Sequence, residues 1–252
     1  MTRLLRSEFY KLFTARSTWV IAAAMLVGTW GMSYVDAYEA VGVSSDDPRL
    51  YSAVPVPAEY NGFDMAGWGY VFVVALGALW AASEYGRSGQ IRTTLAALPK
   101  RLGLFGIKAL VCASSVMLLS FASMSGGVMI THYLARDGIS PIALNAAVWA
   151  HLAGLAYAWA MVALLAFSLG VLARSMIVPL AVLLPLVVGI GDFLVGLTPW
   201  AKYLPTVAAE SLYSYSGSGT FLSPLAGGIV VGVWGLLLSA IAGFVFFRRD
   251  GA

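Results

Sequence analysis

Charged side chains are scarce in this sequence: Lys, Arg, Asp and Glu make up 11% of its 252 residues, and 60% of the residues are hydrophobic. The mean hydropathy is +0.84. A soluble domain of this length needs a far more polar surface than this composition supplies. We therefore expect one membrane domain over residues 1–252 and no separate soluble domain.

Groups that usually carry chemistry are also few. A single cysteine, Cys112, excludes an intrachain disulfide. The sequence contains no G-x-x-x-x-G-K-[ST] phosphate loop, which excludes that way of binding ATP. The two histidines, His132 and His151, have no metal-ligand spacing with other ligands and are best explained as polar anchors near the outer ends of neighbouring spans. We expect no catalytic residue, cofactor or metal on this chain.

The sequence shares some features with one class of membrane enzyme, the intramembrane serine proteases. Intramembrane serine proteases with six spans pair a serine with a histidine from another helix, and the run Ser123–Gly126 has that character. His132 follows Ser125 by seven residues, which is roughly 10 Å along one helix. A nucleophile and its base must lie about 3 Å apart, and nothing in the sequence directs His151 to Ser125. The pattern therefore argues against a protease.

Long apolar runs dominate the chain. A membrane-spanning helix needs roughly 20 apolar residues, and window reasoning finds six such runs. Because the runs are continuously apolar rather than alternating, a closed β-barrel is excluded. The sequence predicts an all-α integral membrane protein with six transmembrane helices, at Thr18–Val35, Met65–Ala82, Leu104–Thr131, Val148–Leu172, Met176–Gly196 and Leu222–Phe247.

The basic residues predict the orientation. With the N-terminus inside, 12 of the 15 Lys and Arg residues fall in or beside inner segments, and only Arg49, Arg136 and Lys202 fall outside. An excess of Lys and Arg marks the cytoplasmic side, so both termini are expected in the cytoplasm. The net charge of +3 then reflects this sorting, and nucleic acid is not expected as a partner.

The first seventeen residues are amphipathic. Leu5, Phe9, Leu12 and Phe13 share one face of a helix, and basic residues occupy the other faces. This pattern favours a helix in the inner membrane interface. The simpler alternative is ordinary basic flanking sequence before the first span.

The segment Glu84–Arg101, EYGRSGQIRTTLAALPKR, is a basic island between the second and third spans. Ser88 is a candidate N-cap, Ile91, Leu95 and Leu98 share one helix face, and Pro99 ends the helix. Four basic residues of the segment surround this apolar face: Arg87, Arg92, Lys100 and Arg101. The pattern alone fits two roles equally well: a helix lying on the inner leaflet, or a surface on which a protein docks.

The fifth span contains interior prolines, including Pro185, and carries Asp192 near its outer end. Interior prolines bend a helix and free carbonyl groups that need other partners in lipid. Pro185 and Asp192 are therefore candidates for a substrate pathway, although Asp192 fits a structural role at a helix end equally well. Beyond the span, residues 198–219 are too polar to cross a membrane, and Thr206–Tyr213 is expected to form a short helix entering from outside.

Three stretches together resemble the permease subunits of ABC-2-type exporters. The opening LLRSEFYKLFTARSTWVIA is similar to the entry of that family, and Trp200–Ser211, with Tyr203-Leu204-Pro205, is similar to its segment between the last two spans. In the basic island Gln90 departs from the family, which usually has threonine there. The residues that match the family pattern in this island are Glu84, Tyr85, Gly89, Ile91, Arg92, Thr94, Leu95, Pro99 and Arg101.

The resemblance implies a half-transporter in a bacterial plasma membrane. It would pair with a second copy or a homologue and with two cytoplasmic ATPase subunits, which would hold the ATP and Mg²⁺. Residues 84–101 would be the coupling helix and residues 198–219 the outer re-entrant element. The cargo expected from the spans is apolar or amphipathic: a drug, a peptide or a lipid. The implied docking residues are Glu84, Arg87, Gln90, Ile91, Arg92, Leu95, Leu98 and Arg101.

One alternative stays open at this point. The chain would then be a membrane scaffold or sensor whose basic segments bind anionic lipid or partner proteins without any transport.

Overall fold

The computed structural model describes residues 2–40, 57–85, 101–135, 138–215 and 222–249, and within these ranges the regular structure is entirely helical. Five of the described helices are long, and the others are shorter. The long helices are α2 (Arg16–Ala40), α3 (Ala66–Tyr85), α5 (Arg101–Ala135), α6 (Ala146–Ala173) and α10 (Pro224–Arg249). The shorter elements are α1 (Thr2–Thr14), η1 (Ala58–Tyr60), α7 (Ile177–Pro185), η2 (Leu186–Ile190), α8 (Gly191–Leu197), η3 (Pro199–Tyr203) and α9 (Pro205–Glu210).

Six helical segments of the described chain are long and apolar enough to cross a membrane. They coincide with the six predicted spans, so the prediction of an all-helical, multi-pass membrane protein is confirmed. Their bounds are Arg16–Glu39, Ala66–Ser83, Gly103–Ala135, Ala146–Ala173, Ile177–Leu197 and Pro224–Arg248.

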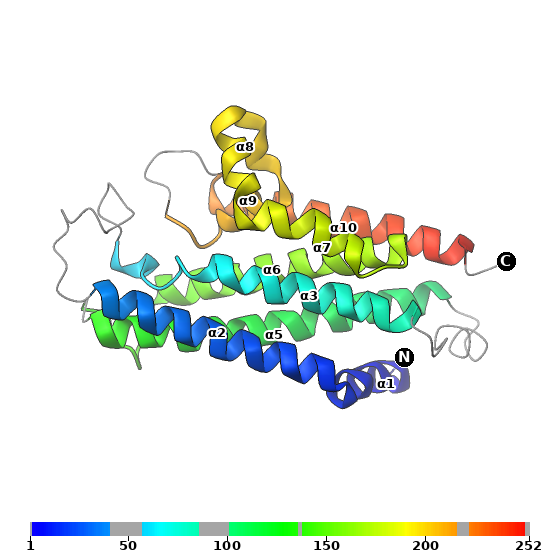
Figure 1. Ribbon diagram of the computed structural model, residues 1–252, viewed down its shortest axis with the longest axis horizontal. Coiled ribbons are helices and arrows are strands. Elements are labelled where there is room, and N and C mark those ends of the chain that lie inside the picture. The colour runs from blue at the N-terminus through cyan, green and yellow to red at the C-terminus, as the bar shows by residue number, and fades with distance from the viewer. Residues whose placement is uncertain (1, 41–56, 86–100, 136–137, 216–221, 250–252) are drawn as a thin grey trace.

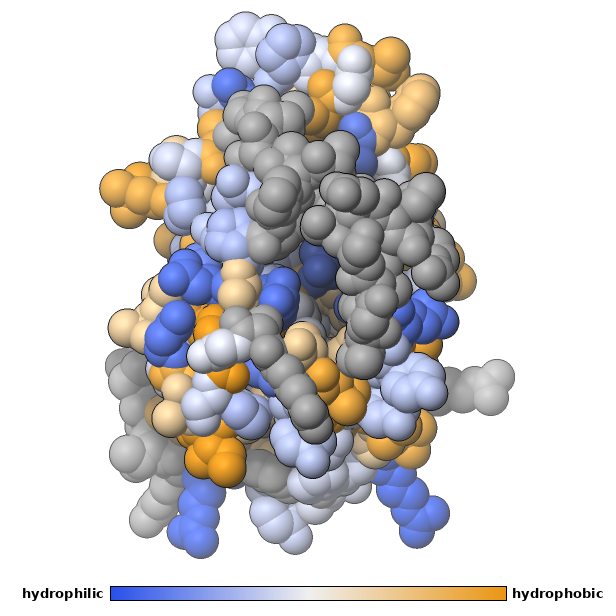
Figure 2. Space-filling model, turned by 90° about the vertical axis from the view of Figure 1, so that its left-hand side faces the viewer, coloured by the Kyte–Doolittle hydropathy of each residue, from blue (hydrophilic) through white to orange (hydrophobic). Residues whose placement is uncertain are grey.

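The long helices run side by side along one axis, and α6 lies at their centre, in contact with α3, α5 and α10 (Figure 1). We call the end that holds α1, Tyr85, Arg101 and Arg249 the terminal end, and the opposite one the distal end. Figure 2 looks onto the distal end, where hydrophilic side chains are spread across the surface and hydrophobic ones project at its flanks. An even number of crossings returns the chain to the end at which it started.

Two glycines of α3 let this helix approach α6 closely. A side chain at Gly69 would occupy the position of the buried Trp159 ring, and one at Gly77 would meet the backbone carbonyl of Ala163. Trp159 is fully buried and lies at the centre of the largest hydrophobic cluster. The large aromatic side chain on α6 therefore packs directly against the backbone of α3, where glycine leaves room for it.

The fifth predicted span is interrupted rather than continuous. Pro185 ends α7, a π-helical turn follows, and Gly189 within it has a φ of 134°. Proline removes one backbone donor, and only glycine adopts this φ without strain. Figure 1 shows that α8 departs from the direction of α7 and projects from the side of the bundle. The bend expected from the prolines is thus present, and it is concentrated at residues 185–190.

The chain then turns back through η3 and α9 before entering α10. The predicted short helix at Thr206–Tyr213 corresponds to α9, which begins one residue earlier and ends at Glu210. Pro205 occupies the first turn of α9, a position where its missing N–H costs nothing. Residues Pro205 to Ala209 are buried against α6 and α10.

Candidate functional site

The predicted docking island is attached to the terminal end of the bundle. Glu84 lies in the last turn of α3 and Arg101 is the first residue of α5, so both ends of the island emerge there. The other implied docking residues, Arg87, Gln90, Ile91, Arg92, Leu95 and Leu98, lie outside the described residues. The described elements at the terminal end include α1, the beginning of α2, the end of α3 and the beginning of α5.

The amphipathic N-terminal segment forms the helix α1, as its pattern predicted. Its apolar face is directed at protein: Leu12 is buried against Ile107 and Val111 of α5, and Leu5 and Phe9 pack beside them. The exposed side of α1 carries Tyr10 and the basic Arg6. The packing of α1 therefore depends on the first three turns of α5, which follow the basic island.

A buried ion pair reinforces this contact. The Lys108 ammonium donates a hydrogen bond of 2.6 Å to the Glu8 carboxylate, and Lys11 donates a second of 2.8 Å to its other oxygen. Glu8 is 1% exposed and Lys108 is 3% exposed. Burial alone would raise the pKa of Glu8, but attraction and hydrogen bonding, mainly from Lys108 and then from Lys11, hold this pKa below its usual value.

Sequence reasoning missed this pair, although a signal was present. Glu8 lies on the same helix face as Leu5, Phe9 and Leu12 and is the only acidic residue before Asp36. A charged residue within an apolar face is costly unless it has a partner. The sequence alone contained no means of choosing Lys108, 100 positions away, as that partner.

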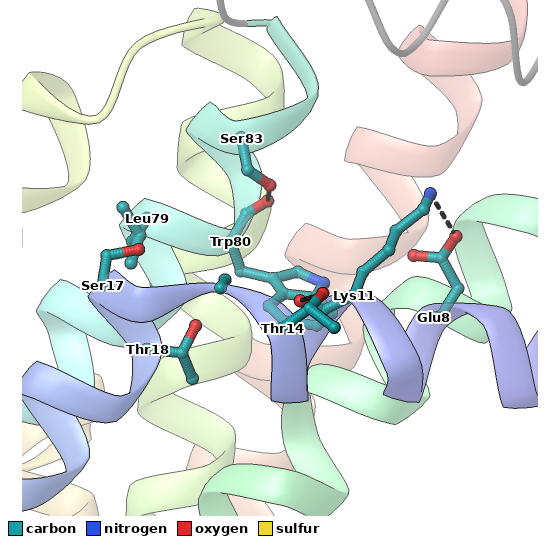
Figure 3. Close-up of a pocket in the computed structure, with 9 residues that line it drawn as sticks. Glu8, Lys11, Thr14, Ser17, Thr18, Leu79, Trp80 and Ser83 are labelled. Carbon is teal, nitrogen blue, oxygen red and sulfur yellow. Dashed lines mark hydrogen bonds and ion pairs between the residues drawn. The ribbon is translucent and has the colours of Figure 1, made fainter.

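A pocket of about 300 Å³ opens beside the ion pair. Figure 3 shows the Trp80 indole lying between the α1–α2 junction and α3, with the Lys11 side chain extending towards Glu8. Small hydroxyl side chains from three helices form much of the remaining wall. The lining residues are Glu8, Lys11, Thr14, Ala15, Ser17, Thr18, Leu79, Trp80 and Ser83.

The two predicted pathway residues lie in different surroundings. Pro185 lines a shallow apolar groove of about 420 Å³ on the exposed side of α7, together with Leu184 and Val188. Asp192 lies in the first turn of α8, beyond the bend, where its charge acts on Glu210 of α9. The structure therefore does not unite Pro185 and Asp192 in one site.

Glu210 is the second functional candidate that the sequence analysis passed over. Burial, and then the nearby carboxylate of Asp192, raises the pKa of Glu210 to about 7 against the effect of a hydrogen bond from Ser214. Close by, the Tyr213 hydroxyl donates a bond of 3.3 Å to the hydroxyl of Tyr70 on α3. The available signal was that Glu210 is the only acidic residue in the 198–219 segment.

The remaining polar candidates have structural partners. Ser123 and Thr29 share a hydrogen bond of 2.6 Å between α5 and α2, and the Ser125 hydroxyl donates to the Phe121 carbonyl within its own helix. His151 lies against the Glu59 carbonyl and the Tyr60 ring at the distal end. Among residues that the structure describes, no group of three His, Cys, Asp or Glu side chains is placed to hold a metal ion.

Comparison of the chain with protein-family models, curated proteins and solved structures finds no match. The likeness to ABC-2-type permeases therefore depends on the sequence motifs alone, and the transport function that it implies is a proposal.

Proposed function

We propose that this chain is the transmembrane subunit of an ATP-driven ABC-2-type exporter and carries no ATPase activity of its own. The observation that supports this most directly is the arrangement of the terminal end. There a basic segment, residues 86–100, joins the second and third spans at the same end as α1 and the end of α10. A permease that is driven by a separate ATPase subunit needs a segment that contacts this subunit on the cytoplasmic side, where ATP is bound.

In this proposal, residues 84–101 dock on a cytoplasmic ATPase subunit, which holds the ATP and Mg²⁺. Ile91, Leu95 and Leu98 enter an apolar groove, while Arg87, Arg92 and Arg101 meet acidic side chains. Glu84 and Gln90 complete the docking set as polar contacts. Two chains and two ATPase subunits form the complete transporter, with both termini of each chain in the cytoplasm of a bacterial cell.

The Glu8–Lys108 pair supports a route for the movement of the docked segment. Lys108 lies seven residues after Arg101 on the same helix, so displacing the beginning of α5 also displaces α1 through the ion pair. Coupling between distant parts of a protein is carried by packed side chains, ion pairs and rigid helices of this kind. ATP binding and hydrolysis then bias the membrane halves between two arrangements by binding them with different affinities.

A second copy of the chain, or a homologue, packs against the groove on α7. Val188 is 73% exposed there and Ile177 is 71% exposed, which is costly for a surface that water reaches and acceptable for one covered by lipid or protein. The cargo path then lies between the two copies, near the second and fifth spans, with Pro185 on its wall. This wall favours an apolar or amphipathic cargo.

The proposal is tested by changing the apolar face of the docking segment. Ile91→Asp combined with Leu95→Asp is expected to abolish co-purification of a phosphate-loop ATPase from the native membrane and to abolish ATP-driven export. Ile142→Asp, at a distal-end position that is 91% exposed, is the matched control and leaves both intact. The amount of chain in the membrane is measured for each variant, because a docking defect leaves it unchanged.

Persistent co-purification and export in the double variant would refute the docking assignment. If no ATPase accompanies the unaltered chain, and the chain binds anionic vesicles in a strongly salt-dependent way, then the scaffold or sensor role replaces the exporter role.

A further inference from the structure

We propose that the pocket between α1, the beginning of α2 and the end of α3 binds the phosphate-bearing headgroup of an anionic phospholipid. The inference does not depend on the exporter proposal, because a scaffold or a permease would use such a site equally well.

The depth of the pocket is the first argument. Ser17 and Thr18 are among the first residues of the first membrane-spanning segment, and Trp80 and Ser83 are in the last turn of the second. The pocket therefore lies where the hydrocarbon core of the bilayer ends, at the level of the lipid headgroups. Tryptophan is enriched at this level because its ring is apolar and its N–H is polar.

Charge is the second argument. One carboxylate, Glu8, is shared by the ammonium groups of Lys11 and Lys108, so this cluster of three side chains beside the pocket has one net positive charge. Arg16 is exposed at the start of α2 and adds a further positive charge next to the lining residues Ala15 and Ser17. Basic pockets between membrane helices on the cytoplasmic side attract anionic headgroups.

The hydrogen-bonding groups and the size of the pocket complete the argument. The Thr14 and Ser83 hydroxyls already donate to backbone carbonyls of their own helices, which leaves them as acceptors. Such acceptors suit the hydroxyl groups of glycerol, whereas the further hydroxyls of Ser17 and Thr18 on the wall can donate to the oxygens of a phosphate. A volume of about 300 Å³ is at the lower end of ligand sites, which suits a headgroup and excludes a whole lipid.

The occupant is expected to be anionic rather than zwitterionic. A phosphatidylcholine headgroup would bring a quaternary ammonium against Lys11 and Arg16, which repel it. A phosphatidylglycerol headgroup brings only the phosphate charge and two hydroxyl groups. We therefore expect the site to discriminate between these two lipids through charge, with the acyl chains passing along the lipid-facing surface of α2 and α3.

The test uses the full-length purified chain and counts bound lipid by native mass spectrometry, with phosphatidylglycerol and phosphatidylcholine of equal chain length as probes. The unaltered chain is expected to bind phosphatidylglycerol more tightly. Lys11→Gln is expected to weaken that binding about fivefold, the usual effect of one basic residue near a membrane surface. Lys202→Gln, which removes a lysine of η3 that does not line the pocket, is the matched control and leaves binding unchanged.

A second variant separates the pocket from general attraction by positive charge. Ser83→Phe fills the space beside Trp80 without changing any charge, and it is expected to remove the preference for phosphatidylglycerol while leaving phosphatidylcholine binding unaltered. Thermal unfolding of each variant is measured in parallel, so that a loss of binding in a folded chain is distinguished from misfolding.

Three results would overturn the proposal: equal binding of the two lipids, equal effects of Lys11→Gln and Lys202→Gln, or no effect of Ser83→Phe in a folded chain. A further arm adds soluble glycerol phosphate. If glycerol phosphate displaces the lipid completely at a concentration similar to that of the lipid itself, the pocket is a site for free phosphate compounds and not for a membrane lipid.

Discussion

Separating Glu8 from Lys108 is the sharpest perturbation available at the terminal end. The pair joins α1 to α5 with a contact of 2.6 Å and almost no exposed area, and Lys11 supports it from a side chain that is 38% exposed. The substitution Glu8→Met removes the carboxylate that accepts the 2.6 Å hydrogen bond from the buried Lys108 ammonium. Breaking a buried pair from one side costs about 3–5 kcal/mol, whereas an exposed pair such as that of Lys11 contributes about 0–1 kcal/mol.

The two single variants are expected to differ. Lys108→Met leaves Glu8 with Lys11, and the carboxyl group can also take up a proton, so this variant should lose less stability than Glu8→Met. The double variant Glu8→Met/Lys108→Met removes both charges and fills the space with apolar atoms. It is expected within about 1–2 kcal/mol of the unaltered chain or more stable than it. The two changes are therefore strongly non-additive.

Cys112 can report the stability of the unaltered chain, the two single variants and the double variant. It is the only cysteine in the sequence, it is buried, and it lies one helical turn after Lys108 on α5. Labelling by a fluorogenic maleimide during heating gives the temperature at which this region opens. Glu8→Met is expected to lower that temperature by about 10 °C. Near-identical labelling curves for all four proteins, or additive losses in the double variant, would refute a stabilising buried pair.

Three further predictions address other parts of the molecule. Gly77→Ala should destabilise the α3–α6 contact by about 1–3 kcal/mol, because its Cβ meets a backbone carbonyl, whereas Gly67→Ala on the same helix meets nothing within 4 Å and should be neutral or stabilising in the same labelling assay. Burial raises the pKa of Glu210 in the folded chain to about 7, above the 4.5 of the free group. The contribution of Glu210 to stability is therefore complete below pH 4.5 and is lost as the pH rises through 7. Unfolding temperatures should fall between pH 5 and pH 8, and Glu210→Gln should flatten that profile. Val188→Cys should form an oxidative cross-link between two copies in the membrane, and Val233→Cys, exposed on α10, should not; equal cross-linking at both positions would contradict a second copy on the α7 groove.

The spans were predictable because lipid imposes a simple rule on sequence. Each crossing must be long, apolar and helical, and the six predicted runs differ from the observed segments by a few residues at their ends. The amphipathic pattern of Leu5, Phe9 and Leu12 likewise predicted α1. Its partner was not predictable, since an apolar face that suits a membrane surface suits the side of α5 equally well.

The bend in the fifth span was foreseen from its prolines, but its form was not. Pro185 accounts for a break in hydrogen bonding, but the π-helical turn and the φ of 134° at Gly189 are seen only in the structure, where α7 packs on α3 and α6 and α8 packs on η3 and α9. Asp192 was recognised as unusual because a carboxylate in a span is rare. Its effect on Glu210 depended on how the chain folds back through α9, which the local sequence does not specify.

By itself, the sequence determined that this protein is a helical membrane chain with six spans, because hydropathy acts locally and each span is recognised by its own residues. The basic island between the second and third spans fits two roles by its pattern alone, and its docking role remains a prediction from the family resemblance. Only the tertiary structure decided which polar groups meet: Glu8 with Lys108, and Thr29 with Ser123. Such pairs join distant residues through the packing of whole helices, and their energy depends on the burial that this packing produces.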